Sequence, residues 1–304
     1  MISAVGILAS FVTVQVAFYG FKVTEQKRIQ TALNMQLGIS TIVMLIGLWV
    51  LTPFNLPASW YQGIPGSNGH QCSWWHPAIC VTSGLISGFF IGLSTDYYTS
   101  NSHSPVLEIA DKCSSGAAIN VIYGLAVGYL SCIIPVTLLS ITIILCVALM
   151  GMLGVALSAI GMLSTLCVGL AIDSYGPISD NAGGIAELSG CPKHVREVTD
   201  ALDAAGNTTA AVGKGFAIGS AALVSLSLYG AFITRAKAAT ENRLGNVEII
   251  DGWVFGSMFF GAMLPYWFSA LTMKSVGKAA NAMVEEIDRQ LRNVDPNTGE
   301  AKPL

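Results

Sequence analysis

Long apolar stretches, each near the length that a helix needs to cross a membrane, dominate this 304-residue sequence. A bilayer core of about 30 Å takes roughly 20 helical residues at about 1.5 Å each. Only 11% of the residues are charged, whereas a soluble domain carries about 25%. The sequence therefore predicts an all-α, polytopic bundle of transmembrane helices. Seven spans are expected, over residues 3–20, 34–52, 79–98, 117–148, 150–175, 206–233 and 251–272, within a membrane domain at 1–292 that is followed by a frayed tail at 293–304.

The distribution of basic residues predicts how the helices are oriented. Positive residues collect in cytoplasmic loops, and one arrangement assigns eleven basic residues to the cytosol and three to the other side, with Lys214 inside a span. In that arrangement residues 21–33, 99–116, 184–205 and the tail from 273 are cytosolic. The net charge of −3 offers no basic face for nucleic acid, so we expect a multi-pass membrane protein that does not bind nucleic acid.

The outward loop at 52–78 is rich in Trp, Pro and Gly, as is typical of a loop at headgroup level. Cys72 and Cys80 are expected on this non-cytosolic side, where they could form a disulfide. With His70 and His76 they could instead hold zinc, although the spacing matches no common zinc-finger pattern. The sequence leaves both alternatives open.

Polar residues occur where the fifth span meets the cytosol, and such residues beside a membrane usually line a cavity or a site. Asp173 and Asp180 are seven residues apart, so both carboxylates project from one side of the helix if it continues that far. Pro177 disfavours helical backbone at Gly176. We therefore expect the helix to open there into a glycine-rich terminus that a ligand can approach closely.

The sixth span carries a stripe of polar residues. Asp203, Asn207, Ala210 and Lys214 follow at steps of four, three and four, which places them on one helix face. Helix capping would explain Asp203, but it does not explain a lysine two turns deeper, which costs about 3 kcal/mol unless it meets water or an anion. Oxygen and amide ligands suit Mg²⁺ that is shared with phosphate. Asp180 with this stripe fits a magnesium–phosphate substrate or, in a secondary transporter, another anion.

A third group of polar residues lies beyond the third span. Asp96, Glu108 and Asp111 could face a site, but a solvated loop explains them equally well, and His103 has the pattern of a surface residue.

Several strings in the chain resemble the membrane-bound, proton-pumping inorganic pyrophosphatases of vacuolar type. The strings are "GLAIDSYGPISDNAGGIAEL", "TDALDAAGNTTAAVGKGFAIGSAALVSL", "DYYTSNSHSPV" and "GAMLPYWFSALTMKSVG", and the resemblance runs over about residues 1–292. It implies a homodimer of all-helical subunits in a vacuolar or acidocalcisome-type membrane. It also implies a cytosolic funnel where Mg²⁺-pyrophosphate is hydrolysed while the protein, embedded in membrane lipid, moves protons outward across the bilayer.

The resemblance assigns roles to individual residues. It implies that Asp180 and Asn207 hold magnesium or the attacking water, and that Lys214 is the lysine of the substrate funnel. Family members that require potassium carry alanine at the position of Ala210, which implies stimulation by K⁺. Asp173 and Asp203, on the same helix faces by their spacing, complete the predicted substrate- and ion-binding set.

Two departures from the family pattern matter. Asp96 stands where the family usually has glutamate, and the strings that supply most substrate-binding carboxylates in the family are absent from these 304 residues. We therefore expect the middle-to-C-terminal portion of a longer pump, inactive in isolation. A secondary anion transporter and an inactive, truncated membrane subunit are the alternatives.

Overall fold

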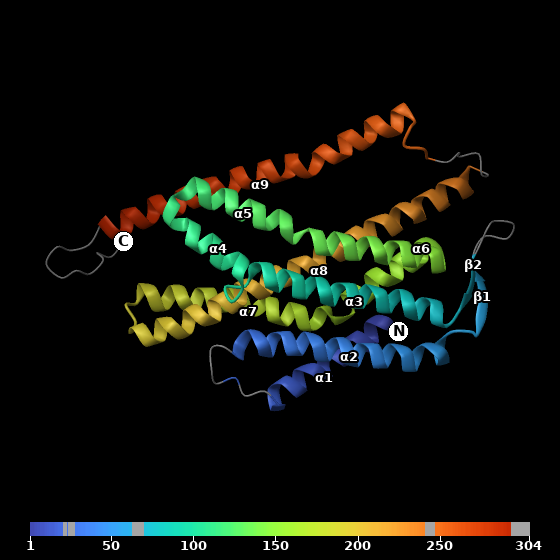
Figure 1. Cartoon of the computed structure of the whole chain (residues 1–304), viewed down its shortest axis with the longest axis horizontal. Coiled ribbons are helices and arrows are strands. Elements are labelled where there is room, and N and C mark those ends of the chain that lie inside the picture. Colours follow the sequence, from blue (N-terminus) through green and yellow to red (C-terminus); the bar gives the residue numbers. More distant parts are fainter. Residues whose placement is uncertain (21–22, 24–27, 63–69, 241–246, 293–304) are drawn as a thin grey trace. The chain divides into compact units, whose positions relative to one another are not determined.

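The computed structural model describes residues 1–20, 23, 28–62, 70–240 and 247–292, and it is almost entirely helical (Figure 1). The predicted all-α bundle is confirmed, with six helical stretches long and apolar enough to cross a membrane in the described residues. The elements are α1 (Ile2–Gly20), α2 (Ile29–Asn55), β1 (Ser59–Gln62), β2 (His70–Ser73), α3 (Trp75–Thr99), α4 (Ser104–Lys112), η2 (Cys113–Ser115), α5 (Ala117–Ser131), α6 (Ile133–Met162), η3 (Leu163–Thr165), α7 (Leu166–Leu188), α8 (Lys193–Ala239) and α9 (Gly252–Arg292).

The chain forms two compact units, residues 1–235 and 236–304, where the sequence suggested one membrane domain over 1–292. The second unit contains α9, a single helix of 41 residues with Pro265 inside it. The helix is longer than the predicted span at 251–272 and continues to Arg292. The expected frayed tail at 293–304 lies outside the described residues.

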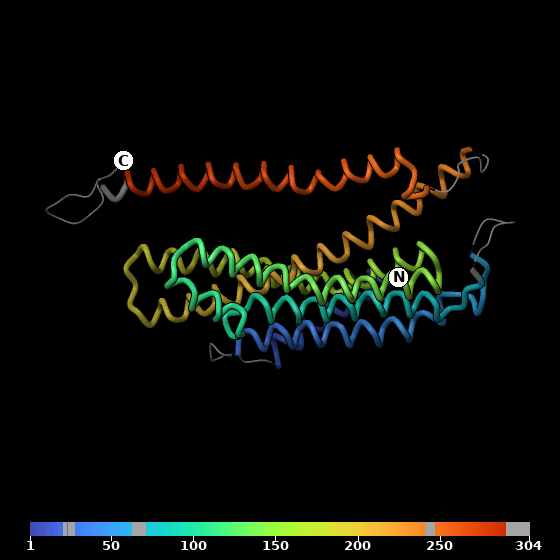
Figure 2. The backbone as a smooth tube through the Cα atoms, turned by 45° about the horizontal axis from the view of Figure 1, so that its top comes forward, coloured from blue at the N-terminus to red at the C-terminus, as the bar shows by residue number. Residues whose placement is uncertain are grey.

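One of the six apolar stretches, Ala117–Leu188, has 72 residues and contains α5, α6 and α7. Its backbone leaves the helical conformation at Gly151, with φ 59° and ψ −147°. A Cβ atom on Gly154 would lie 2.5 Å from the carbonyl oxygen of Cys146, whereas residues eight apart in a straight helix are about 12 Å apart. The chain therefore turns back within α6, as Figures 1 and 2 show. The turn lies close to the predicted boundary between residues 148 and 150.

Small residues let α3 and α6 pack backbone to backbone in the first unit. A Cβ atom on Gly84 would lie 2.8 Å from the Cα of Ser158, and one on Gly161 would lie 2.9 Å from the Cα of Val81. Small residues at such contacts are typical of helices that associate in lipid. A rigid pair of helices thus supports α8, since Phe216 of α8 belongs to the same buried cluster as Met162 of α6.

The loop expected at 52–78 is shorter than predicted and contains a β-hairpin. Strands β1 and β2 pair antiparallel, with Trp60 opposite Cys72, and residues 63–69 lie outside the described part of the chain. Cys72 and Cys80 are fully buried and are not joined to each other, so the disulfide that the sequence left open is not formed. Burial raises the pKa of the Cys72 thiol. The described residues contain no group of three or more side chains that could hold a metal, so the zinc alternative finds no support.

The connections of the first unit lie at its two ends (Figure 1). The end of α1, the start of α2, helix α4 and the α7–α8 turn gather at one end, whereas the β-hairpin and the turn within α6 lie at the other. Three of the segments that the basic residues assigned to the cytosol thus lie at the same end of the unit, as one common orientation requires.

Candidate active site

Helices α7 and α8 form a tight antiparallel hairpin. Gly190 adopts φ 62°, and its N–H donates to the carbonyl of Glu187 (3.1 Å) while the N–H of Cys191 donates to that of Ala186 (3.0 Å). These are the two hydrogen bonds of a Schellman motif, which ends a helix at a left-handed glycine. Pro192 follows directly, and α8 begins at Lys193.

The expected opening of the chain at Pro177 is wrong. Helix α7 continues through Gly176 and Pro177 to Leu188, so the "SDNAGG" string is helical. In a membrane helix a proline is tolerated because neighbouring groups satisfy the freed backbone. Residues 184–205, expected to be a loop, are therefore helical except for the turn at 189–192.

Two close contacts define how α7 and α8 align. A Cβ atom on Gly206 would lie 2.8 Å from the Cα of Gly176, and one on Gly183 would lie 4.0 Å from the Cβ of Thr199. Seven residues forward along α7 thus correspond to seven residues back along α8. By this register Asp180, four residues past Gly176, is level with Leu202, four residues before Gly206. Asp203 is the next residue of α8, about 1.5 Å further along the helix.

Charged residues recur every seven positions along one side of this hairpin. Seven residues complete about two turns, so residues at this spacing share a helix face. On α7 these are Asp173, Asp180 and Glu187. On α8 they are Arg196, Asp203 and Ala210, with Asn207 and Lys214 alongside. The two ends of this face are in contact. Arg196 pairs with Glu187 at 3.4 Å, and a Cβ on Gly213 would lie 2.7 Å from the Cγ of Asp173. The level between these ends holds Asp180 and Asp203.

Asp203 and Asn207 act together on α8. The amide of Asn207 donates to Oδ2 of Asp203 over 3.1 Å, while Oδ1 of Asp203 is buried and has no hydrogen-bond partner in the described part of the chain. Because α8 begins ten residues earlier, at Lys193, helix capping no longer explains Asp203. A buried carboxylate oxygen without a partner requires water or an ion. The oxygen in question belongs to Asp203, a member of the stripe that the spacing predicted.

Asp173 and Lys214 form the deepest level of the face. Oδ1 of Asp173 is also buried, with no hydrogen-bond partner among the residues that the structure describes, and Lys214 lies close enough to act on this carboxylate electrostatically. A cavity of about 10 Å³ adjoins Asp173 and Gly213, which is about the space that one water needs. The positive charge of Lys214 therefore offsets the negative charge of an intramembrane carboxylate, in addition to its predicted role toward an anion.

The structure brings some of the predicted site residues together and leaves others apart. Asp180, Asn207 and Lys214 are exposed, and Ala210 is half-buried. Within the described residues no hydrogen bond or ion pair joins Asp180 to Asn207 or Lys214. Asp180 and Asp203 offer two carboxylates beside an amide. This donor set fits Mg²⁺, which takes one or two carboxylates and completes its shell with waters and substrate phosphates.

A second polar cluster joins Asp96 to two amides that the sequence did not single out. Asp96 is only 6% exposed, and its carboxylate accepts hydrogen bonds from Gln30 (2.8 Å) and Asn34 (2.9 Å) of α2. The four-residue spacing of these two amides at the start of a span was the available signal. Glu108 and Asp111 are exposed, but they lie in helix α4 and not in the expected loop.

The comparison with known protein families follows this geometry. The family model described as inorganic H⁺ pyrophosphatase matches residues 1–303. The chain belongs to this family.

Relatives in the family are pumps of two kinds by name. A Clostridium tetani protein, provisionally named a K⁺-stimulated pyrophosphate-energized sodium pump, is 41% identical over 97% of this chain and 41% of its own length. K⁺-insensitive pyrophosphate-energized proton pumps of Caldanaerobacter subterraneus and Methanosarcina mazei are 38% and 35% identical, over 99% and 100% of this chain and 43% of each relative. The chain thus spans about two fifths of the length of these curated relatives.

Together the family and the six apolar stretches identify an integral, multi-pass membrane protein. The relatives come from bacteria and an archaeon, so the expected vacuolar or acidocalcisome membrane finds no support.

Proposed function

We propose that this chain works as part of an ion-translocating inorganic pyrophosphatase, in which hydrolysis of pyrophosphate on the cytosolic side drives a monovalent cation across the membrane. Its support is the membership of the family together with one structural observation. Two carboxylates, Asp180 and Asp203, lie within about one residue of the same level on one face of the α7–α8 hairpin, and Asp203 keeps a buried oxygen without a hydrogen-bond partner among the described residues.

The residues of this face divide the work as follows. Asp180, Asp203 and Asn207 would hold Mg²⁺, which when bound polarises phosphorus and offsets phosphate charge. Asp203 orients the amide of Asn207 through their hydrogen bond. Lys214 draws the anionic substrate toward the same face, and Asp173 lies close enough to offset part of its charge.

The test compares hydrolysis of pyrophosphate by membranes that contain the full-length protein carrying this chain. We expect Mg²⁺-dependent phosphate release that Asp180→Asn abolishes. Glu108→Gln, an exposed acid of α4 remote from the face, is the matched control and should keep the wild-type rate. Binding or exchange of an anion without phosphate release would instead establish the secondary transporter.

We further propose that the pump is stimulated by K⁺. Ala210 lies half-buried on the stripe, where a lysine in place of alanine would bring its own charge to the cation's position. Among the relatives named above, the K⁺-stimulated protein is a sodium pump and the K⁺-insensitive proteins are proton pumps. This pairing favours Na⁺ for a chain with alanine here, over the proton that the sequence analysis expected. Two assays on sealed vesicles distinguish the ions: uptake of ²²Na⁺ indicates a sodium pump, and acidification of the vesicle interior indicates a proton pump.

The homodimer implied by the resemblance remains a proposal for the whole pump. Mass measurement of the detergent-solubilised, full-length protein checks it, since a single subunit mass would contradict it.

A further inference from the structure

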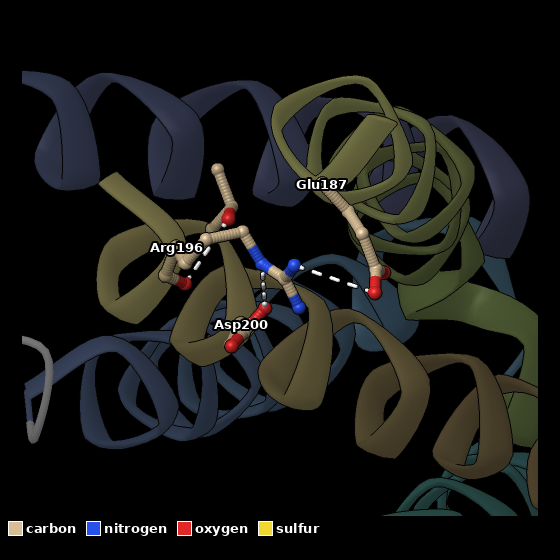
Figure 3. Close-up of polar contacts among 4 residues, drawn as sticks. Glu187, Arg196 and Asp200 are labelled. Atoms are coloured by element: carbon tan, nitrogen blue, oxygen red, sulfur yellow. Dashed lines mark hydrogen bonds and ion pairs between the residues drawn. The ribbon is translucent and has the colours of Figure 1, made fainter. Parts of the chain in front are cut away.

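Arg196 ties α7 and α8 together at the cytosolic tip of their hairpin (Figure 3). Its Nη1 lies 3.4 Å from Oε1 of Glu187 on α7, and its Nε lies 3.6 Å from Oδ1 of Asp200 on its own helix. The side chain of Arg196 is 33% exposed, whereas those of Glu187 and Asp200 are 65% and 60% exposed. The guanidinium is therefore the inner member of the cluster, held between two helices.

The position of this tie relates it directly to the carboxylate pair. Glu187 follows Asp180 by seven residues, and Arg196 precedes Asp203 by seven. Two helical turns, about 10.5 Å, thus separate the Glu187–Arg196 pair from the Asp180–Asp203 pair on the same face. Because α7 and α8 are continuous helices across this distance, a rotation or slip at the tip moves both carboxylates.

Near the tip, Arg196 is the residue that restrains rotation of α7 against α8, because the neighbouring contact between the two helices is loose. Gly183 and Thr199 meet only at van der Waals distance, 4.0 Å for the ideal Cβ of the glycine. On the membrane side of Asp180, the hydroxyl of Tyr175 donates to the carbonyl of Leu202 over 2.7 Å. Arg196 supplies the corresponding polar tie on the cytosolic side, so the level of Asp180 and Asp203 is fixed from both directions.

We propose that Arg196 is a positioning residue of the pyrophosphatase site, which sets the register of α7 against α8 and thereby the spacing of Asp180 and Asp203. This inference rests on the proposed function of that face. It predicts that Arg196 acts on the affinity for Mg²⁺ without contacting pyrophosphate.

The first experiment is a double-mutant cycle on the full-length pump. Arg196→Ala and Glu187→Gln should each raise the Mg²⁺ concentration for half-maximal hydrolysis by about fivefold, the upper range for an exposed ion pair. The double variant should be no worse than either single one, because both remove the same tie. Lys193→Ala is the matched control, since Lys193 pairs with Glu197 of its own helix at 3.7 Å, and it should leave the Mg²⁺ dependence unchanged.

The cycle separates positioning from direct binding of substrate. If Arg196 bound pyrophosphate, Arg196→Ala would raise KM for pyrophosphate while Glu187→Gln would not, and that result overturns the inference. An Arg196→Ala variant with the wild-type Mg²⁺ dependence overturns it as well. A wild-type protein that hydrolyses no pyrophosphate would instead refute the proposed function, so the two failures are distinguishable.

The second experiment replaces the ion pair with a covalent tie. Cysteines at Gly183 and Thr199 would have Cβ atoms about 4.0 Å apart, within the range of about 3.5–4.5 Å that a disulfide needs. In the Arg196→Ala background, oxidation of this pair should restore the wild-type Mg²⁺ dependence, and reduction should remove it again. The same cysteine pair with Arg196 retained is the control. This control should be active in both redox states, which shows that the disulfide itself does not inhibit the pump. Failure of the oxidised pair to restore the wild-type Mg²⁺ dependence in the Arg196→Ala background then contradicts the inference. If the disulfide itself inhibits the pump, the double-mutant cycle is the deciding test.

Discussion

The contact between Gly176 and Gly206 makes a strong prediction, because it sets how closely α7 and α8 approach beneath the carboxylate pair. A Cβ atom on Gly206 would lie 2.8 Å from the Cα of Gly176 and 2.7 Å from Oγ of Ser179. The first distance is 0.6 Å short of the 3.4 Å at which ordinary contact begins. Gly206→Ala therefore has to push the two helices apart by at least that amount, because the obstacle is backbone.

The free energy of unfolding should change little, whereas activity should fall strongly. Overpacking costs about 1–3 kcal/mol, and replacing a helical glycine with alanine returns about 1 kcal/mol. A displacement approaching 1 Å at a reacting centre can lower the rate by about 100-fold. We expect kcat for pyrophosphate to fall by about 10- to 100-fold, with a decrease of only about 2–4 °C in the midpoint of thermal unfolding.

The assay measures phosphate release and thermal unfolding on the same purified, full-length protein. Gly128→Ala in α5 is the control, since a Cβ there meets no atom within 4 Å, and it should keep the wild-type kcat. A Gly206→Ala protein with wild-type kcat would show that the spacing of α7 and α8 does not govern the site.

Three further predictions concern other parts of the chain. Ala210→Lys should remove stimulation by K⁺, seen as equal rates of hydrolysis with and without K⁺; continued stimulation would contradict the role of this position. Asp96→Ala should lower the free energy of unfolding by about 1–3 kcal/mol, because it removes two hydrogen bonds between a buried carboxylate and the half-buried amides of Gln30 and Asn34; an unchanged unfolding curve in detergent would refute this. Because burial raises the pKa of Cys72, the unfolded state ionises first as the pH rises above about 8.5. Stability should therefore decline between about pH 8 and 10, and Cys72→Ala should weaken that decline in thermal melts.

Much of the fold follows from the length and spacing of apolar residues. The division of the long stretch at 117–188 near residue 149 was predictable because no single span needs 72 residues, and the structure turns at Gly151. The stripe from Asp203 to Lys214 was predictable because all its members lie in one helix. Its hydrogen bond between Asp203 and Asn207 follows from their four-residue spacing.

The errors arose where tertiary contacts override local preference. Pro177 disfavours a helix in isolation, yet α7 continues through it while packing against α8 at Gly176. The polar composition of residues 184–205 suggested a loop, but α7 and α8 extend beyond the apolar spans and leave only a short turn. The partners of Asp96 lie more than sixty residues away in sequence, and the register that brings Asp180 close to the level of Asp203 depends on glycine contacts between helices. Neither can be obtained from spacing within one helix.

The central claim is that Asp180 and Asp203 face one magnesium–pyrophosphate site from neighbouring helices. A structure of the full-length pump with Mg²⁺ and methylenediphosphonate tests it most directly. We predict a Mg²⁺ ion with a carboxylate oxygen of Asp180 at about 2.0–2.1 Å and with Asp203 and Asn207 on the same side of the bound diphosphonate. Magnesium held entirely by residues outside the α7–α8 hairpin, with Asp180 turned toward lipid, would show that these two carboxylates do not form the site.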